Sequence, residues 1–390
     1  MQAVKLLHDQ MKAAVPTMHA VRMASLFAHV EGLLRGESLS VTSVGRGGPG
    51  KSDEKHKIKR ADRLVGNRHL NAERQATYGW ISRALIGHAQ QPLILVDWSD
   101  VDPAQTLYLL RAAVVIEGRA LPVYEEVHTR YHHPQDTTRF LRRLAALLPA
   151  LCQPVIVTDA GFKTPWYRAV EALGWYYLGR VRSRDHICLV GRDEWLPNKA
   201  LHDQATGKPK ALGEVLLARS VALPTRAYLY KQPARGRSKR GVHGQRRRNA
   251  ASLKHATGAT EPWLLVSNLD PGNKIAQAVV ALYSRRMAIE QSFRDLKAHR
   301  HGFAFRQNLG RNAARVANLL LIAALGTLAT WVMGTAGQQL GLARGLQANT
   351  ERRMTVLSVF FIGTRLLKQG FQCALSTLRD AQRRLSELIL

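Results

Sequence analysis

The sequence predicts an α/β fold in which a mixed β-sheet carries helices on both faces. Two short apolar runs, LILV at 93–96 and VIVT at 155–158, each lead directly into an aspartate. Runs of this kind are typical of buried strands. Two longer apolar runs, 107–116 and 121–127, lie on either side of residues 117–119 and predict a hairpin. Helical stretches between the strands complete the α/β pattern.

Residues 1–88 are predicted to form a helical N-terminal region. Apolar side chains recur every three to four positions through residues 1–36, which indicates two helices, and Gly36 is a plausible end. A helix at SLSVTSVGR, a break rich in Gly, Pro and Ser at 45–52, and a helix in EKHKIKRADRLVGNRHL follow. This order is typical of a helix-turn-helix-like DNA-reading segment.

The second of these helices is basic on one face. Ile58, Ala61 and Leu64 or Val65 are expected to face inward. The outward residues would then meet phosphates or base edges, and they are Lys55, Lys57, Lys59, Arg60 and Arg63. A solvated basic helix explains the same pattern equally well.

Residues 89–182 are predicted to be the first part of a catalytic domain. A helix at 137–148 is stopped by Pro149, and a helix at 164–173 leads to a strand at 175–181. Three early strands, a helix and alternating αβ units match a ribonuclease-H-like fold.

Residues 183–270 are predicted to be a β-rich insertion, because the helical period disappears and short apolar runs alternate with Gly, Pro and Asn. Within it, residues 231–248 are strongly basic. We expect this run to contact DNA backbone without sequence preference, although such runs are usually solvated loops. The residues expected to make this contact are Arg235, Arg237, Lys239, Arg240, Arg246, Arg247 and Arg248.

Residues 271–335 are predicted to be the second part of the catalytic domain. A single helix is expected over 274–300, and steps of 3, 4 and 7 place Tyr283, Arg286, Glu290 and Lys297 on one stripe of it. An acid with cationic and phenolic neighbours can hold a divalent metal while those neighbours contact the phosphate. The alternative is an exposed helix with surface ion pairs.

Three acids are therefore candidate metal ligands: Asp97, Asp159 and Glu290. The first two follow buried strands, and open α/β sheets place their chemistry at the carboxyl ends of strands. Carboxylate oxygens suit Mg²⁺, and a pair of such ions can drive in-line displacement at a phosphodiester. Asp100 would leave the strand in another direction and is not expected to be a ligand.

Residues 336–390 are predicted to be a helical, basic C-terminal region. The apolar segment 316–337 is long enough to cross a bilayer, but it contains Asn318 and several Thr and Gly residues. We therefore expect a buried helix behind the sheet and no membrane contact.

Composition points to a polyanionic partner. The chain has 57 Lys and Arg against 28 Asp and Glu, a formal net charge of +29, and its 46% hydrophobic content supports a sizeable core. Three scattered cysteines and no evident secretory signal fit a reducing cytosol. His128, His132 and His133 are expected to lie in a surface loop rather than to bind zinc.

The order of the three acids, with the pattern Tyr-x2-Arg-x3-Glu-x6-Lys around the last, resembles the DDE transposases of the insertion-sequence-four family. The segments VDWSD, TDAGFKTPW, LGWYYLGRVR and EPWLLVSNL are similar to its insertion-sequence-ten branch. The resemblance covers nearly the whole chain.

This resemblance implies a cut-and-paste transposase of the bacterial cytoplasm that uses two Mg²⁺ ions, for which Mn²⁺ would substitute. It implies that the N-terminal region binds transposon ends and that a homodimer assembles on double-stranded DNA. Tyr283, Arg286 and Lys297 would contact phosphate, and Trp263 would stack on a flipped base. For Trp263 the alternative is a core tryptophan within a strand.

Two other functions remain open from the residues alone. A ribonuclease-H-like nuclease or resolvase would cut without joining. A DNA-binding repressor would keep the fold and lose catalysis.

Overall fold

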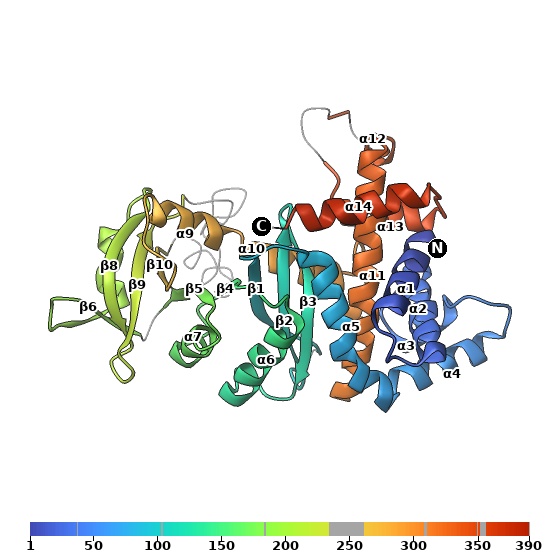
Figure 1. The fold of residues 1–390 in the computed structure, drawn as a ribbon, viewed down its shortest axis with the longest axis horizontal. Helices are drawn as coiled ribbons and strands as arrows, with labels where there is room; N and C mark the ends of the chain where they lie inside the picture. Colours follow the sequence, from blue (N-terminus) through green and yellow to red (C-terminus); the bar gives the residue numbers. More distant parts are fainter. Residues whose placement is uncertain are drawn as a thin grey trace, which may run out of the picture. The chain divides into compact units, whose positions relative to one another are not determined.

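The computed structural model describes residues 1–36, 38–102, 104–182, 185–233, 261–307, 310–348, 350–351 and 356–389. The chain divides into two compact units (Figure 1). Unit 1 comprises Met1–Cys152 with Met287–Leu390, and unit 2 comprises Gln153–Arg286. Both contain strands and helices, so the predicted mixed α/β architecture is confirmed.

Helices form the N-terminal part of unit 1, as the sequence predicts. Apolar side chains of the first two helices, including Leu7, Met11 and Leu26, are fully buried between them and their neighbours. Asn67 caps the fifth helix, because its Oδ1 accepts hydrogen bonds from the backbone N–H groups of His69 and Leu70 at 2.9 and 3.1 Å. The bounds are α1 (Gln2–Ala14), α2 (Ala20–Arg35), α3 (Val41–Arg46), α4 (Glu54–Val65) and α5 (Arg68–Ile86).

The strands of unit 1 form an antiparallel meander of β1 (Leu93–Asp100), β2 (Tyr108–Ile116) and β3 (Arg119–His128). The turn between β2 and β3 consists of Glu117 and Gly118, both with positive φ (40° and 75°), which is the geometry that two-residue hairpins favour. The predicted hairpin is therefore confirmed. One detail of the prediction is wrong: β1 does not end at Asp97 but continues to Asp100, because pairing with β2 extends that far.

Helices cover both faces of this meander. Arg111 and Glu125 point to the face covered by α10 (Met287–Lys297), since Arg111 contacts Ser292 of that helix. Side chains alternate along a strand, so Glu126 points to the other face, where it meets Arg143 of α6 (Pro134–Leu147).

The strands of unit 2 are consecutive in the strand order. Only β4 and β5 pair in parallel, and they are connected by α7 (Thr164–Glu171), whereas the other described pairs are antiparallel. Strand β10 pairs with both β5 and β9, so strands from the β-rich segment continue the sheet beyond β4 and β5. The strand order is β4 (Val155–Thr158), β5 (Tyr176–Val181), β10 (Trp263–Ser267), β9 (Leu223–Tyr230), β8 (Lys210–Leu217), β6 (His186–Leu189) and β7 (Trp195–Pro197). A 3₁₀ helix, η1 (Asn198–Gln204), follows β7, and α9 (Ile275–Ser284) packs against the strands of this unit.

The expectation of a single helix over 274–300 is wrong, because the segment forms two helices, with Tyr283 in α9, Arg286 in the turn between them, and Glu290 and Lys297 in α10. Helix α9 ends at Ser284 and α10 begins at Met287. Between them the backbone hydrogen bonds have the 3₁₀ pattern, in which each N–H donates to the carbonyl three residues earlier. Arg285 N donates to Leu282 O, and Arg286 N donates to Tyr283 O. The physical reason is that each helix packs on the strands of its own unit, α9 on β8–β10 and β5, and α10 on β1–β3.

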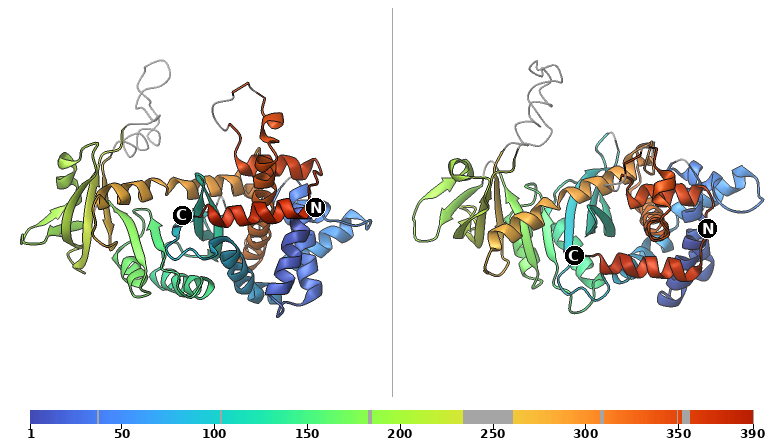
Figure 2. Two further views of the ribbon diagram at one scale, coloured as in Figure 1. Left: turned by 45° about the horizontal axis from the view of Figure 1, so that its top comes forward. Right: turned by 90° about the horizontal axis from the view of Figure 1, so that it is seen from above.

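The longest helix, α11 (Ala313–Gln339), is the centre of the helical part of unit 1 and contacts α1, α2, α4, α5, α13 and α14 (Figures 1 and 2). Among the described residues it is the one helix long and apolar enough to cross a membrane, and 94% of its most apolar window is buried in the protein. Asn318 donates to Val65 O at 2.9 Å. The segment is thus a core helix, as predicted. The remaining elements are η2 (Phe305–Gln307), α12 (Ala343–Leu346), α13 (Val359–Lys368) and α14 (Leu375–Glu387).

Candidate active site

Asp97 is the first residue of β1 that is not fully buried. Residues Leu93 to Val96 before it are buried, and Asp97 itself is half-buried. Its Oδ1 accepts a hydrogen bond from the backbone N–H of Trp98 at 2.8 Å, which fixes the carboxylate relative to the strand. Across the sheet Asp97 pairs in register with Arg111.

Arg111 is a residue of this site that the sequence interpretation missed. It is 3% exposed and forms an ion pair with Glu125, which is 1% exposed, at 2.7 Å. It also donates to Ser292 Oγ of α10 at 2.9 Å, and its guanidinium lies 4.8 Å from the ring centre of Phe293. The signal was present, since an arginine interrupts the apolar run YLLRAAVVI and a buried charge requires a partner.

Glu290 lies in the first turn of α10 and is exposed. Ile289, Ser292, Phe293 and Leu296 are buried on the opposite side of the helix. Because α10 packs on β1, β2 and β3, the elements that carry Asp97 and Glu290 belong to one packed layer of unit 1. Two hydrogen bonds hold α10 on these strands: Arg111 of β2 donates to Ser292, and Lys297 donates to Ser99 of β1.

Lys297 is held at the last turn of α10 against β1. Its Nζ donates to Ser99 Oγ at 2.6 Å, and Ser99 lies two residues after Asp97 on the same face of the strand. Burial is the main cause that lowers the pKa of Lys297 to about 8; the charge of Asp100 opposes it, and those of Arg111 and Arg306 add to it. The side chain is thus half-charged at about pH 8, mostly charged at lower pH and mostly neutral at higher pH.

Asp159 follows β4 directly in unit 2, as predicted, and is half-buried. Its Oδ1 accepts a hydrogen bond from Gly161 N at 2.8 Å, which orients the carboxylate at the start of the turn into α7. Thr164 begins that helix, with Pro165 in its first turn.

Tyr283, Arg286 and Trp263 belong to unit 2. Tyr283 is buried, and its ring lies 5.0 Å from that of Trp263 at 73°. Trp263 begins β10, is half-buried and also contacts Tyr230. Arg286 lies in the turn between α9 and α10.

A half-buried arginine, Arg180, lies near this group. Burial lowers the pKa of Arg180, as do the charges of Arg182 and Arg286, whereas Tyr283 and Glu261 raise it. Arg180 and Arg182 both form ion pairs with Glu261. Cationic and aromatic side chains therefore gather at the start of β10 within unit 2.

The donor chemistry of the three predicted ligands fits a hard divalent ion, because each supplies only carboxylate oxygens. Whether the three side chains lie close enough to share an ion is a separate question. In the described residues no group of three or more His, Cys, Asp or Glu side chains is arranged to hold a metal. Asp97 and Glu290 belong to unit 1 and Asp159 to unit 2, so the convergence of the triad stays a prediction.

The predicted DNA-reading helices are present as α3 and α4. Ala61, Leu64 and Val65 are buried as expected, and Ile58 is half-buried. A Cβ on Gly45 of α3 would lie 2.7 Å from Ile58 Cα, so a glycine is required where the two helices meet. Of the basic residues Lys57 is half-buried and the others are exposed, namely Lys55, Lys59, Arg60 and Arg63. The seven basic residues predicted for nonspecific contact, Arg235, Arg237, Lys239, Arg240, Arg246, Arg247 and Arg248, lie outside the described residues.

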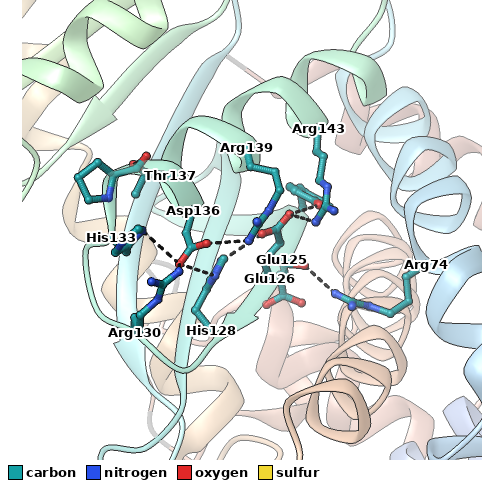
Figure 3. A network of polar contacts seen from close by, with 12 residues as sticks. Arg74, Glu125, Glu126, His128, Arg130, His133, Asp136, Thr137, Arg139 and Arg143 are labelled. Atoms are coloured by element: carbon teal, nitrogen blue, oxygen red, sulfur yellow. Dashed lines mark hydrogen bonds and ion pairs between the residues drawn. The ribbon is translucent and has the colours of Figure 1, made fainter.

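The expected surface loop of histidines is corrected at His128, which ends β3 and is 6% exposed (Figure 3). Its Nε2 lies 3.1 Å from Glu126 and its Nδ1 lies 3.8 Å from Asp136. Burial raises the pKa of Glu126, but hydrogen bonds from His128, Tyr124 and Arg143 outweigh it and hold that pKa at about 2. Two acids therefore lie near His128, and each is paired with arginine: Glu126 with Arg143, and Asp136 with Arg130 and Arg139.

Comparison with known proteins adds one finding. The family model described as the transposase DDE domain matches residues 88–326, which is more than half of the chain. Among curated proteins, none matches the sequence.

Proposed function

The chain belongs to the transposase DDE domain family, and from this we propose that it is a cut-and-paste DNA transposase of the insertion-sequence-four family, insertion-sequence-ten branch. Its substrate is double-stranded DNA, both the terminal inverted repeats of its own element and the target into which the element is inserted. The fold of the catalytic part is proposed to be ribonuclease-H-like, with the β-rich segment as an insertion.

One observation carries this proposal: the family match spans all three predicted acids and the elements that hold them. Asp97 stands in β1, Asp159 directly after β4 and Glu290 in the first turn of α10. The chain order Asp, Asp, Glu is the order of the family's acidic triad.

Asp97, Asp159 and Glu290 would together hold two Mg²⁺ ions, with Mn²⁺ as a substitute. Such ions, when bound, activate the attacking oxygen and relieve charge on the leaving oxygen. The chain's own residues bind and orient the DNA. Lys297 holds an ammonium on the Asp97 face of β1, and Arg286 supplies a second cation. Both are suited to phosphate oxygens.

The proposed reaction proceeds in four steps. Water cleaves one strand at the transposon end and releases a 3′-hydroxyl. That hydroxyl attacks the opposite strand, which forms a hairpin on the transposon end and frees the flanking DNA. Water reopens the hairpin, and the same 3′-hydroxyl then displaces a phosphodiester oxygen in the target. Each step exchanges one oxygen for another at phosphorus.

End recognition is assigned to the N-terminal helices. The exposed basic residues of α4 would contact phosphates or base edges, and a homodimer would pair two ends in the bacterial cytoplasm, on the nucleoid. Two copies are needed because each end must be cut and both must join one target.

A direct test uses duplexes that carry the element's terminal repeats, with labelled strands and a target plasmid. We expect nicked, hairpin and joined products only when Mg²⁺ or Mn²⁺ is present. Cutting without joining would instead identify a nuclease or resolvase. Binding without any cutting would identify a repressor.

End binding is expected to weaken above pH 8 because Lys297 loses its charge there. Its lowered pKa of about 8 means that the cation is present below this pH and lost above it. Once the lysine is mostly neutral, affinity should fall by up to about tenfold per pH unit. Fluorescence anisotropy without metal, at constant ionic strength on either side of pH 8, measures this.

Lys297→Arg provides the matched control, because an arginine stays charged throughout this range. Its affinity should be nearly independent of pH. A wild-type protein whose pH dependence matches that of the arginine variant would exclude Lys297 as the titrating contact.

Trp263→Ala is expected to leave first-strand nicking largely intact and to impair hairpin formation. Stacking of a flipped base on the indole would offset the cost of unstacking it from the duplex. Denaturing gels that resolve nicked and hairpin products measure the two steps. Trp263→Phe should retain part of the hairpin activity, and equal losses at both steps would contradict this role.

A further inference from the structure

A cluster of aromatic rings surrounds the exposed side chain of Tyr131 in the loop between β3 and α6. Tyr131 is 55% exposed. Its ring lies 5.2 Å from that of Tyr108, 5.5 Å from that of Trp98 and 4.2 Å from that of His132. These rings come from β1, β2 and the loop itself, so the exposed tyrosine rests on the end of the sheet of unit 1.

The loop is held in a fixed conformation. His132 has a positive φ of 52°, which is costly for a residue with a side chain and persists only where the surroundings enforce it. Its ring lies 5.4 Å from that of Trp98. Trp98 is itself buried, and its Nε1–H has no hydrogen-bond partner in the described structure. The aromatic platform formed by Trp98, Tyr108, Tyr131 and His132 is therefore pre-organised.

Arg130 precedes the tyrosine in the loop, and one buried acid orients both Arg130 and Arg139 of the following helix (Figure 3). Asp136, which is buried at the start of α6, forms ion pairs with Arg130 at 3.4 Å and Arg139 at 2.7 Å. The two arginine side chains are themselves 58% and 51% exposed. Arg139 and Arg142 also line an open hollow of about 440 Å³ on α6. The acid faces inward and the cations face solvent, so the surface presents positive charge.

We propose that this surface binds DNA at an unstacked nucleobase: Tyr131 stacks on the base, and Arg130, Arg139 and Arg142 contact the phosphates beside it. An exposed aromatic face among cations is the chemistry that single-stranded nucleic acid requires. An apolar protein partner would need a continuous apolar patch, whereas Tyr131 is the exposed large hydrophobic side chain of the described stretch 104–148.

The surface is distinct from the predicted base contact at Trp263, which belongs to unit 2. It is connected to the proposed acid Asp97 through the adjacent Trp98, whose side chain points to the opposite face of β1. The inference rests on the proposed function, since it specifies a second place where the DNA substrate is deformed.

The test uses short duplexes that contain one bulged 5-iododeoxyuridine, or the same sequence fully paired. Tyr131→Ala is expected to bind the bulged duplex about tenfold more weakly and to bind the paired duplex as the wild type does. Tyr131→Phe should retain wild-type binding, because the ring is the contact. Leu151→Ala, which removes another exposed apolar side chain of unit 1, is the matched control and should change neither affinity.

Illumination of the bulged complex should attach the iodinated base to a peptide that contains Tyr131. Duplexes with terminal-repeat sequence and with unrelated sequence show whether end or target DNA supplies the base. A cross-link elsewhere, or equal loss on bulged and paired DNA, would overturn the stacking contact. If the wild type cleaves its ends while Tyr131→Ala binds the bulged duplex normally, the stacking proposal is wrong and the proposed function stands. If the wild type binds no DNA, the proposed function is wrong as well.

Discussion

Replacing Asp97 by asparagine is expected to abolish metal-dependent cleavage of transposon ends while end binding persists. The amide keeps the shape of the side chain, and its oxygen can still accept the hydrogen bond from Trp98 N. It removes the negative charge that a divalent ion requires. We expect a rate loss of about a thousandfold or more, equivalent to about 4 kcal/mol of transition-state stabilisation. Labelled end DNA, analysed for nicked product and for bound complex, measures both quantities.

Asp159→Asn and Glu290→Gln should behave in the same way if the three acids act together. Asp100→Asn is the matched control, because it removes a carboxylate from the same strand three residues further on. It should cleave within a few-fold of the wild type. A cleavage-competent Asp97→Asn protein, or an equally inactive Asp100→Asn protein, would remove the basis for the triad.

The same variants give a readout that is independent of activity. Carboxylates brought close together repel one another until a cation enters, so Mg²⁺ or Mn²⁺ should raise the thermal unfolding temperature of the wild type. That increase should be smaller in each triad variant and unchanged in Asp100→Asn. Equal metal stabilisation in all of these proteins would place the ion elsewhere.

Arg111→Met is expected to cost about 3–5 kcal/mol of folding free energy. The substitution leaves Glu125 buried without its cation and removes the bond from Arg111 to Ser292, which joins β2 to α10. Urea denaturation followed by tryptophan fluorescence measures the loss. Because α10 carries Glu290, the surviving folded fraction should also cleave more slowly.

The double variant Arg111→Met with Glu125→Gln separates the two causes. Removal of both charges eliminates the uncompensated carboxylate, so much of the stability should return. Arg119→Met is the control for a more exposed pair, since Arg119 meets Asp295 at 3.4 Å nearer to solvent, and its cost should be about 1 kcal/mol or less. An Arg111→Met protein as stable as this control would refute the role of Arg111 in holding α10 on β2.

The local pattern of the sequence was enough for much of the fold. The runs at 93–96 and 155–158 became β1 and β4, and Asp159 follows its strand directly as predicted, whereas Asp97 lies inside β1. Glu117 and Gly118 made the two-residue turn of the hairpin. The inward positions of α4 were also identified, because a helical period records which side of an element is buried.

Other features depended on which elements pack together. The turn at Arg285 and Arg286 interrupts an otherwise helical pattern, because α9 and α10 each follow the strands of a different unit. His128 looked like a loop residue but is buried, since Glu126 on β3 and Asp136 on α6 provide acids beside it. Neither the turn nor the burial of His128 can be recognised from the neighbouring residues in the sequence.

The sequence by itself determined most of the elements, the order of the three acids and the family, because periodicity and residue spacing are properties of the chain alone. The tertiary structure decided that Arg111 joins β2 to α10 and that Tyr131 rests on Trp98 and Tyr108. These contacts join residues far apart in sequence, and their energy exists only after burial has removed water from between them.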